Sequence, residues 1–357
     1  MSLNRIRRAV ALAAVLAAMS QFAVRAAGHA KLGPPPKATE PYPRIPESGE
    51  MVRASVPSIN VGNRAEVVSF FNTFYLPTQG VDAQWTGNVA SCSPGTTSIP
   101  YREATLQRVN YFRAMTGLPG NVALNATWNS QCQQAALMMI AEGDLSHSPG
   151  PTWACYTTDG ATAAGKSNLA LGADGPDAID LYIDDPGAGN SVVGHRRWIL
   201  YPPQQTMGTG STTGNNGYYY GSNALWVFGG AGTRPATPEW VSWPPPGYVP
   251  FQLVYGRWSF SYPNADFSNA TITMTHKGNP VTLTKAPVVN GYGDNTVVWE
   301  PSGIPGGKPS QDLTYTVQLS GVVIAQTPRQ FVYDVIVIDP DAVVETGVRT
   351  RTWELYR

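Results

Sequence analysis

The sequence predicts an α+β protein in which a mixed domain precedes an all-β domain. Apolar residues recur with helical spacing between residues 101 and 200. Short β-rich runs separated by turn residues fill the part after residue 250. Between these parts, residues 234–250 hold six prolines and two tryptophans, which predicts a stiff linker and the best domain boundary.

The mixed domain is predicted to contain four helices followed by two strands. Leu106, Val109, Phe112 and Met115 recur every three residues, and Gly117 follows as a stop signal. In the second helix, Thr127 is expected as the N-cap and the following glycine as the stop. The helices are expected at residues 101–116, 127–142, 176–185 and 191–200, and the strands at 206–212 and 223–228.

The last third of the chain reads as a series of short strands. They are expected at residues 257–262, 270–276, 281–284, 296–299, 314–320 and 331–338. Turn signals such as Asn290-Gly291 separate them. Short, evenly spaced strands of this kind predict a β-sandwich over residues 251–357, of the immunoglobulin-like type.

The N-terminus has the features of a secretory signal peptide. Arg5, Arg7 and Arg8 precede an apolar run over residues 9–19, and cleavage is expected after Ala26. The alternative is an uncleaved membrane anchor, and no later stretch is long and apolar enough for a transmembrane helix. Residues 27–63 are rich in proline and lack apolar periodicity, so we expect a linker or a loosely held arm.

The composition suits a secreted protein and argues against a nucleic-acid partner. Charged residues make up 13% of the chain, about half the usual ~25%. The formal net charge is zero, and no dense Lys/Arg cluster follows the signal segment. Binding to phosphates requires clustered positive charge, so nucleic acid is excluded as the expected partner.

Three cysteines allow at most one intramolecular disulfide bond. Cys92 and Cys155 lie in loop-like sequence, whereas Cys132 lies inside a predicted helix. We therefore favour a disulfide between Cys92 and Cys155, with Cys132 as a small buried apolar residue. Sequence alone leaves the other pairings open, and the spacing does not match a structural zinc site.

Two of the four histidines mark a candidate site. His147 lies in Leu-Ser-His-Ser-Pro, and His195 lies in Gly-His-Arg-Arg-Trp-Ile-Leu. Imidazole is the side chain that most readily binds metals or moves protons near neutral pH, so the two would mark a site if the fold brings them together. Arg196 and Arg197 are interpreted as surface or ion-pair residues.

The central block resembles the CAP superfamily, which includes cysteine-rich secretory proteins, venom allergens and plant pathogenesis-related proteins. Five motifs occur in the family's order over about residues 100–230: Arg108-Val-Asn110-Tyr-Phe-Arg113, Leu145-Ser-His147-Ser, Ser167-Asn168-Leu-Ala, Gly194-His195-Arg-Arg-Trp-Ile-Leu and Met207-Gly-Thr-Gly210. The resemblance implies a CAP-like α-β-α sandwich, which we place at residues 64–233.

The resemblance also implies a cleft that contains two histidines and two glutamates. His147 and His195 match the histidines, Ser167 stands in place of the first glutamate, and Asp185 stands in place of the second. Two imidazoles and one carboxylate could hold a divalent metal such as zinc, with a water in the fourth position. Alternatively, His195 with Asp185 could polarise Ser167 or a water, although Ser167 lacks the usual nucleophile context.

Three functions follow from this pattern. The first is a secreted binding or interaction module whose cleft takes a lipid, glycan, peptide or cell-surface partner. The second is a metal-assisted hydrolase acting on a peptide, ester or cell-wall substrate through the same cleft. The third is a structural envelope protein with a vestigial cleft. The loss of one carboxylate at Ser167 and the shortening of the other at Asp185 favour binding over catalysis.

Overall fold

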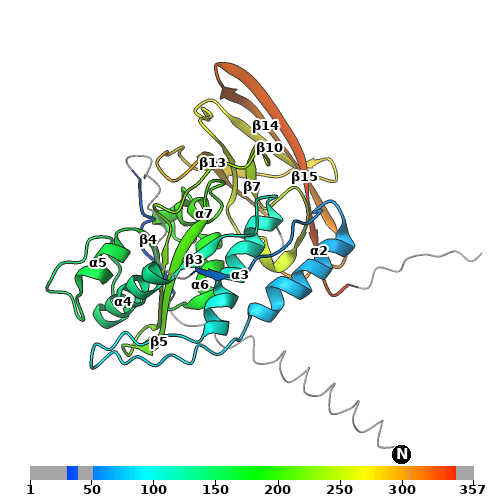
Figure 1. Cartoon of the computed structure of the whole chain (residues 1–357). Helices are drawn as coiled ribbons and strands as arrows, with labels where there is room; N and C mark the ends of the chain where they lie inside the picture. The colour runs from blue at the N-terminus through cyan, green and yellow to red at the C-terminus, as the bar shows by residue number, and fades with distance from the viewer. Residues whose placement is uncertain (1–29, 39–50, 305, 343–357) are drawn as a thin grey trace, which may run out of the picture.

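The computed structural model describes residues 30–38, 51–304 and 306–342. These residues form a mixed part and an all-β part that pack against each other (Figure 1). The predicted α+β class is therefore confirmed. The predicted signal peptide, residues 1–26, lies outside the described residues.

A six-stranded sheet forms the centre of the mixed part, with the strand order β1-β4-β6-β5-β3-β2. Neighbouring strands are antiparallel, except that β3 and β5 are parallel. The strands are β1 (Lys31–Leu32), β2 (Met51–Arg53), β3 (Ala123–Asn125), β4 (Ser167–Leu171), β5 (Thr206–Asn215) and β6 (Tyr220–Trp226).

Helices cover both faces of this sheet. Because side chains alternate along a strand, Leu169 and Leu171 pack on α4 and α5, while Ala170 packs in the core formed with α3 and α6. The helices are α2 (Arg64–Phe70), α3 (Ile99–Met115), α4 (Ala126–Glu142), α5 (Thr158–Ala164), α6 (Gly175–Asp184) and α7 (Gly194–Ile199). Short π- or 3-10-helical turns lie at Phe71–Tyr75, Leu76–Thr78, Ala188–Asn190 and Phe251–Leu253.

Capping explains where the two long helices begin and end. The Ser98 hydroxyl accepts a hydrogen bond from the backbone of the first turn of α3. In α4, the Asn125 side chain accepts from Trp128 N at 3.0 Å, so the N-cap is Asn125 and the assignment of Thr127 is wrong. Gly143 ends α4 in the left-handed conformation, with φ of 76°, as predicted.

Two sheets make up the all-β part, with orders β11-β10-β14-β15-β8 and β12-β13-β9-β7. Aromatic side chains from the two sheets meet between them, as in the contact of Phe260 with Phe331 at 4.9 Å between ring centroids. The strands are β7 (Val241–Trp243), β8 (Gly247–Pro250), β9 (Trp258–Tyr262), β10 (Thr271–His276), β11 (Asn279–Pro280), β12 (Leu283–Lys285), β13 (Asn295–Pro301), β14 (Leu313–Ile324) and β15 (Thr327–Ile338).

The segment interpreted as a stiff linker, residues 234–250, is partly β-structure. Its second half contains β7, which pairs with β9, and β8, which pairs in parallel with β15. Trp243 of β7 also contacts Phe112 of α3 at 5.0 Å between ring centroids. The prolines of this segment lie before, between and at the end of short edge strands, where no ladder hydrogen bond is lost.

The predicted loosely held arm, residues 27–63, is not loose where the structure describes it. Its described residues add β1 and β2, which are the two edge strands of the six-stranded sheet (Figure 1). We use the name arm from here on for residues 31–38 only. In that segment Pro35 and Pro36 are buried.

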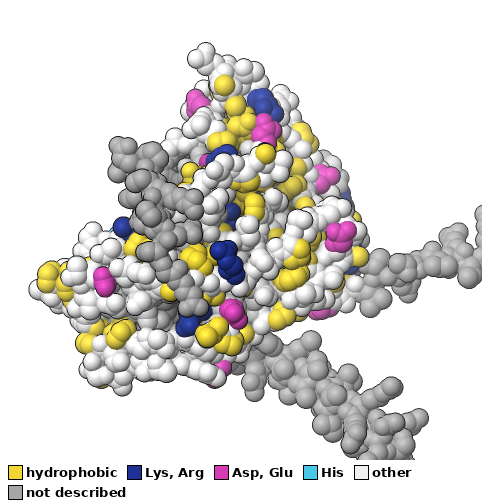
Figure 2. Space-filling view, viewed as in Figure 1, with side chains coloured by type: hydrophobic (Ala, Val, Ile, Leu, Met, Phe, Trp, Pro, Cys, Tyr) yellow, Lys and Arg dark blue, Asp and Glu magenta, His cyan; other side chains and the backbone are white. Residues whose placement is uncertain are grey.

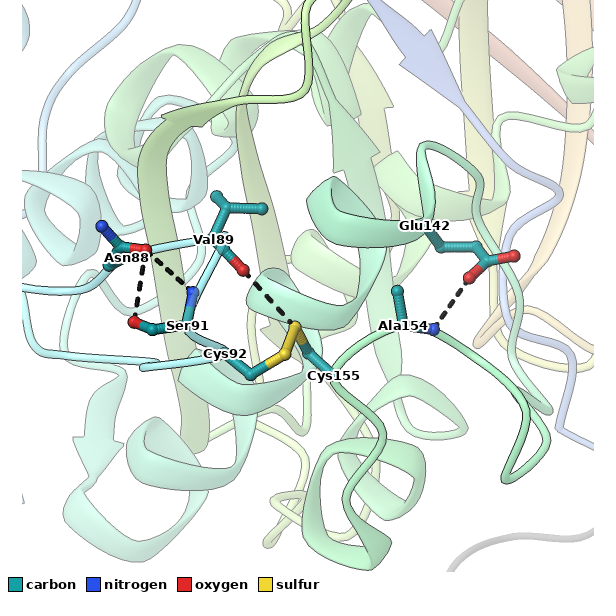
Figure 3. The surroundings of a disulfide bond; sticks show 7 residues. All are labelled: Asn88, Val89, Ser91, Cys92, Glu142, Ala154 and Cys155. Carbon is teal, nitrogen blue, oxygen red and sulfur yellow. Dashed lines mark hydrogen bonds between the residues drawn. A yellow bond between two sulfur atoms is a disulfide. The ribbon is translucent and has the colours of Figure 1, made fainter.

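The predicted disulfide bond between Cys92 and Cys155 is confirmed. It joins the loop before α3 to the loop between α4 and α5, and Figure 3 shows Val89 O close to the Cys155 sulfur. Cys132 is free and fully buried in α4, as predicted. Burial raises the pKa of the Cys132 thiol to about 12.

The low charge content of the sequence is visible on the surface. On the face shown in Figure 2, charged side chains are few and are scattered among apolar and uncharged polar ones. Among the described residues, no helix is both long and apolar enough to cross a lipid bilayer.

Candidate functional site

A buried carboxylate–imidazole pair lies where the sequence places the candidate site. Asp185 Oδ1 accepts a hydrogen bond from His195 Nδ1 at 2.7 Å, and both side chains are 0% exposed. Asp185 follows the last residue of α6, and His195 is the second residue of α7. The end of one helix and the start of another therefore create the pair.

The Asp185 carboxylate also serves as the cap of α7. The residue before α7, Val193, gives no side-chain cap, while Asp185 Oδ2 accepts from His195 N at 2.9 Å. The backbone here is strained, because Asp185 and the β-branched Val193 adopt positive φ angles of 55° and 45°. Two unfavourable backbone conformations thus hold one carboxylate against both the start of α7 and the His195 ring.

The far side of the His195 ring is enclosed. Tyr182 stacks on the imidazole with 5.6 Å between ring centroids, and burial raises the pKa of Tyr182 well above its usual value. His195 Nε2 is buried and has no hydrogen-bond partner among the residues that the structure describes. An aspartate that orients a histidine is half of a nucleophile-activating arrangement, but the 0% exposed ring gives a substrate no access in this conformation.

His147 lies in the loop after α4 and contacts backbone oxygens with both ring nitrogens. Nδ1 lies 2.8 Å from Ala164 O, and Nε2 lies 2.8 Å from Pro34 O of the arm. A neutral imidazole has one N–H, so it donates to one of these oxygens, and only the protonated ring donates to both. The ring therefore joins the arm to the end of α5.

Ser167 faces away from the histidine pair. Its hydroxyl lies 3.7 Å from Cys132 Sγ on the α4 side of the sheet. The next residue, Asn168, points to the opposite face, where its Nδ2 donates to His195 O at 3.1 Å. Strand alternation therefore separates Ser167 from His195, and Asn168 is the β4 side chain that contacts α7.

The residues present do not fit a three-ligand metal centre in this arrangement. Both Asp185 oxygens accept N–H groups, and both His147 nitrogens face carbonyl oxygens. Within the part of the chain that the structure describes, no three His, Cys, Asp or Glu side chains form a group that could hold a metal ion. The metal site of His147, Asp185 and His195 stays a prediction.

The two arginines after His195 are buried, so their interpretation as surface residues is wrong. Arg196 is 1% exposed and donates to Ile183 O at 2.6 Å and to Ser259 Oγ of β9 at 3.0 Å. Arg197 is 4% exposed and donates to Val289 O at 2.8 Å. Burial lowers the pKa of both guanidinium groups to about 10, so both remain charged at neutral pH. These contacts fasten α7 to the all-β part.

Comparisons with known proteins agree with this geometry. Residues 106–229 match the family model described as the cysteine-rich secretory protein family. This part of the chain is a CAP domain. The predicted family is therefore confirmed, over almost the same residues as the predicted core.

The other comparisons add little to this assignment. No curated protein matches the chain. Among solved structures, two of PcoC, a methionine-rich copper resistance protein from Escherichia coli, are similar at 19% identity and a TM-score of 0.21. They cover 27% of this chain and 92% and 94% of their own, and at that TM-score they carry no argument.

The polar residues of the first CAP motif hold the domain together. Arg108 of α3 forms an ion pair with Asp180 of α6 and lies 3.8 Å above the Tyr75 ring. Asn110 donates to the Ala54 and Val122 carbonyls. Arg113 donates to five carbonyl oxygens, four of them in residues 199–204, at the end of α7 and just after it. In this chain the motif connects α3 to loops that are distant in sequence.

A cavity of about 470 Å³ lies elsewhere in the CAP domain, between β2 and the N-terminal ends of α3 and α4. None of the three histidines in the described part of the chain lines it. Its lining includes Arg53, Arg102, Glu103, Asn129 and Gln134, and its volume is in the ~300–1,000 Å³ range of small-molecule sites. No motif pointed to this cavity, because most of its lining comes from segments outside the five motifs, and Thr209 is the one lining residue that lies in a motif.

Proposed function

We propose that this chain is a secreted CAP-domain binding module, and that its ligand surface lies around His147 and α7. The observation that carries the proposal is that this surface already holds an extended segment, the arm. His147 Nε2 lies 2.8 Å from Pro34 O, and Trp198 Nε1 donates to Pro36 O at 2.7 Å. Side-chain donors that face a ligand backbone are typical of peptide recognition.

Binding is better supported than catalysis by the state of the candidate catalytic groups. The His195 ring is fully buried, and the hydroxyl of the candidate nucleophile, Ser167, faces α4. A general base needs hydrogen-bond contact with the proton that it abstracts. A hydrolase would require the arm and the His195 surroundings to rearrange first, and it remains the alternative, beside a structural envelope role.

The confirmed disulfide is compatible with an extracellular location, because such bonds persist in oxidising compartments. Export itself is part of the proposal. Expressing the complete chain and sequencing the N-terminus of the protein found outside the cell tests it. Mature protein that begins at Ala27 is expected, and protein retained inside the cell with Met1 in place would contradict it.

Binding and turnover assays on the purified secreted chain separate the three functions. Phosphatidylcholine vesicles, a glycan array and an array of short peptides are the binding probes, and peptide, ester and cell-wall substrates are the turnover probes. Saturable binding to one probe class supports the module. Turnover that a chelator abolishes, and that His195→Ala abolishes while the circular dichroism spectrum and the protection of the arm from trypsin stay unchanged, would instead establish the hydrolase. No binding and no turnover would favour the structural role.

A further inference from the structure

The arm follows the CAP domain closely over eight residues. Its first two residues form β1 and pair with Ala170 and Leu171 of β4. Lys31 forms an ion pair with Asp144, and Ala38 N donates to Gly291 O of the all-β part at 3.0 Å. The arm therefore crosses from the sheet edge of the CAP domain to the all-β part.

Three consecutive prolines occupy the middle of this path, and each meets a specific feature. The carbonyls of Pro34 and Pro36 face His147 and Trp198, as described above. Pro35 packs on Gly194, where an added Cβ would lie 2.5 Å from the Pro35 ring. Only a glycine at the start of α7 leaves room for this ring.

The chemistry of the surface suits a proline-rich peptide. Proline has no N–H, so a run of prolines presents only carbonyl acceptors and flat rings, in a backbone that is already extended. The surface supplies the Trp198 N–H as a donor, the His147 ring as a second donor when its Nε2 carries the hydrogen, and an aromatic wall. Trp198 is itself held edge-to-face by Phe228 at 4.8 Å and by Tyr201 at 6.0 Å, so its N–H direction is fixed before a peptide binds.

The sheet edge beside this surface offers a second contact. Among the described residues, only the edge strand β1 pairs with β4 on this side, and it covers two of the five residues of β4. An edge strand presents free backbone donors and acceptors that an added peptide strand can satisfy. The arm thus combines strand addition at β4 with proline recognition at α7.

The Tyr292 ring lies beside the same point, since a Cβ added at Gly194 would be 2.8 Å from Tyr292 Cδ1. Resting on the function proposed above, we infer that the surface formed by His147, Gly194, Trp198 and Tyr292 is a binding site for extended proline-rich peptides. The arm is its occupant within the chain. A peptide from another molecule takes the same place when the arm leaves. A tethered occupant acts at an effective concentration of about millimolar, so it lowers the apparent affinity for a free peptide.

A labelled peptide tests this on the full chain. The probe is fluorescein-Lys-Leu-Gly-Pro-Pro-Pro-Lys-Ala, which reproduces residues 31–38. A protease site is introduced between residues 39 and 50, which lie outside the described part, and anisotropy is measured before and after cleavage. Saturable binding to the cut chain, at least ~10-fold tighter than to the intact chain, is expected.

Two matched comparisons make the result specific. A probe with alanine in place of the three prolines should bind at least ~10-fold more weakly, because it loses the preformed extended backbone. Trp198→Phe should weaken the original probe by about 5-fold, the effect of one hydrogen bond. Trp240→Phe is the control, since Trp240 packs on Phe260 and Tyr333 in the all-β part.

An uncut variant covers the case in which the cleaved chain unfolds. Combining Pro34→Gly, Pro35→Gly and Pro36→Gly weakens the arm within the full chain, and the probe should then bind at least ~10-fold tighter than to the unchanged chain. The inference is overturned if the alanine probe binds as tightly as the proline probe. It is also overturned if the proline probe binds neither to the cut chain nor to this variant. If vesicles or glycans still bind, the proposed binding function survives without the peptide site.

Discussion

Replacing Asp185 with alanine, glycine and asparagine separates the contributions of one buried carboxylate to stability. In the structure it caps α7, accepts from the His195 ring, and sits at a residue with φ of 55°. Removing a cap costs about 1 kcal/mol, and removing a hydrogen bond to a charged group costs about 2 kcal/mol. Alanine in the left-handed region costs about 1 kcal/mol more than glycine.

These values predict an order of stability. Asp185→Ala loses the cap and the hydrogen bond and adds the backbone cost of alanine, so it should lower the free energy of unfolding by about 4 kcal/mol. Asp185→Gly loses only the two interactions and should lower it by about 3 kcal/mol. Asp185→Asn tolerates the backbone angle and keeps one acceptor, so we expect a loss of about 1–2 kcal/mol. With an amide N–H facing the ring, the His195 hydrogen should also move from Nδ1 to Nε2.

Urea unfolding, followed by tryptophan fluorescence and far-ultraviolet circular dichroism, measures the order. Nitrogen NMR of the imidazoles, in a chain with only four histidines, reports the tautomer. The reasoning is refuted if Asp185→Asn is as unstable as Asp185→Ala. A glycine variant no more stable than the alanine variant would show that the positive φ stores no strain.

Three further predictions concern the disulfide, the free thiol and the arm. Opening the bond between Cys92 and Cys155, which are 63 residues apart, should cost up to about 4 kcal/mol in urea unfolding; equal stability with and without reductant would contradict this. Because burial raises the pKa of Cys132 to about 12, its thiol is neutral at pH 8. The native chain should therefore react with an aromatic disulfide reagent far more slowly than the unfolded chain, and equal rates would show that the thiol is exposed. Gly194→Ala should displace the arm and speed tryptic cleavage at the arm's lysines by about 10-fold. The control Gly150→Ala, which has open space around its Cβ, should not change the cleavage rate. Equal digestion rates of the two variants would refute the close approach of Pro35 to Gly194.

The long helices could be predicted because their signals are local. Apolar spacing, a capping side chain and a terminal glycine all lie within α4 itself, and the only error was the choice of Thr127 over Asn125 as its cap. The two edge strands β1 and β2 could not be predicted in this way. They are two and three residues long, and their partners lie 70 or more residues away in the sequence.

In the candidate site, too, the contacts that are local in sequence could be predicted and the distant ones could not. The motifs identified Asp185 and His195, which the structure joins, because the two are only ten residues apart and lie at adjoining helix ends. Strand alternation requires that Ser167 and its neighbour face opposite sides, but the sequence does not say which side faces His195. The burial of Arg196 was missed because its partners are backbone carbonyls and a serine 63 residues away.

The motif that begins at Gly194 therefore connects three parts of the molecule, and this changes how its variants must be interpreted. Each of its first five residues contacts a different partner: Pro35 for Gly194, Asp185 for His195, β9 for Arg196, the loop before β13 for Arg197 and Pro36 for Trp198. Any substitution there disturbs the CAP domain, the arm or the all-β part before it reaches a ligand. Loss of activity in His195→Ala alone would thus fit a structural role as well as a chemical one. A chemical role needs a variant that keeps the fold and the arm in place while changing the reaction.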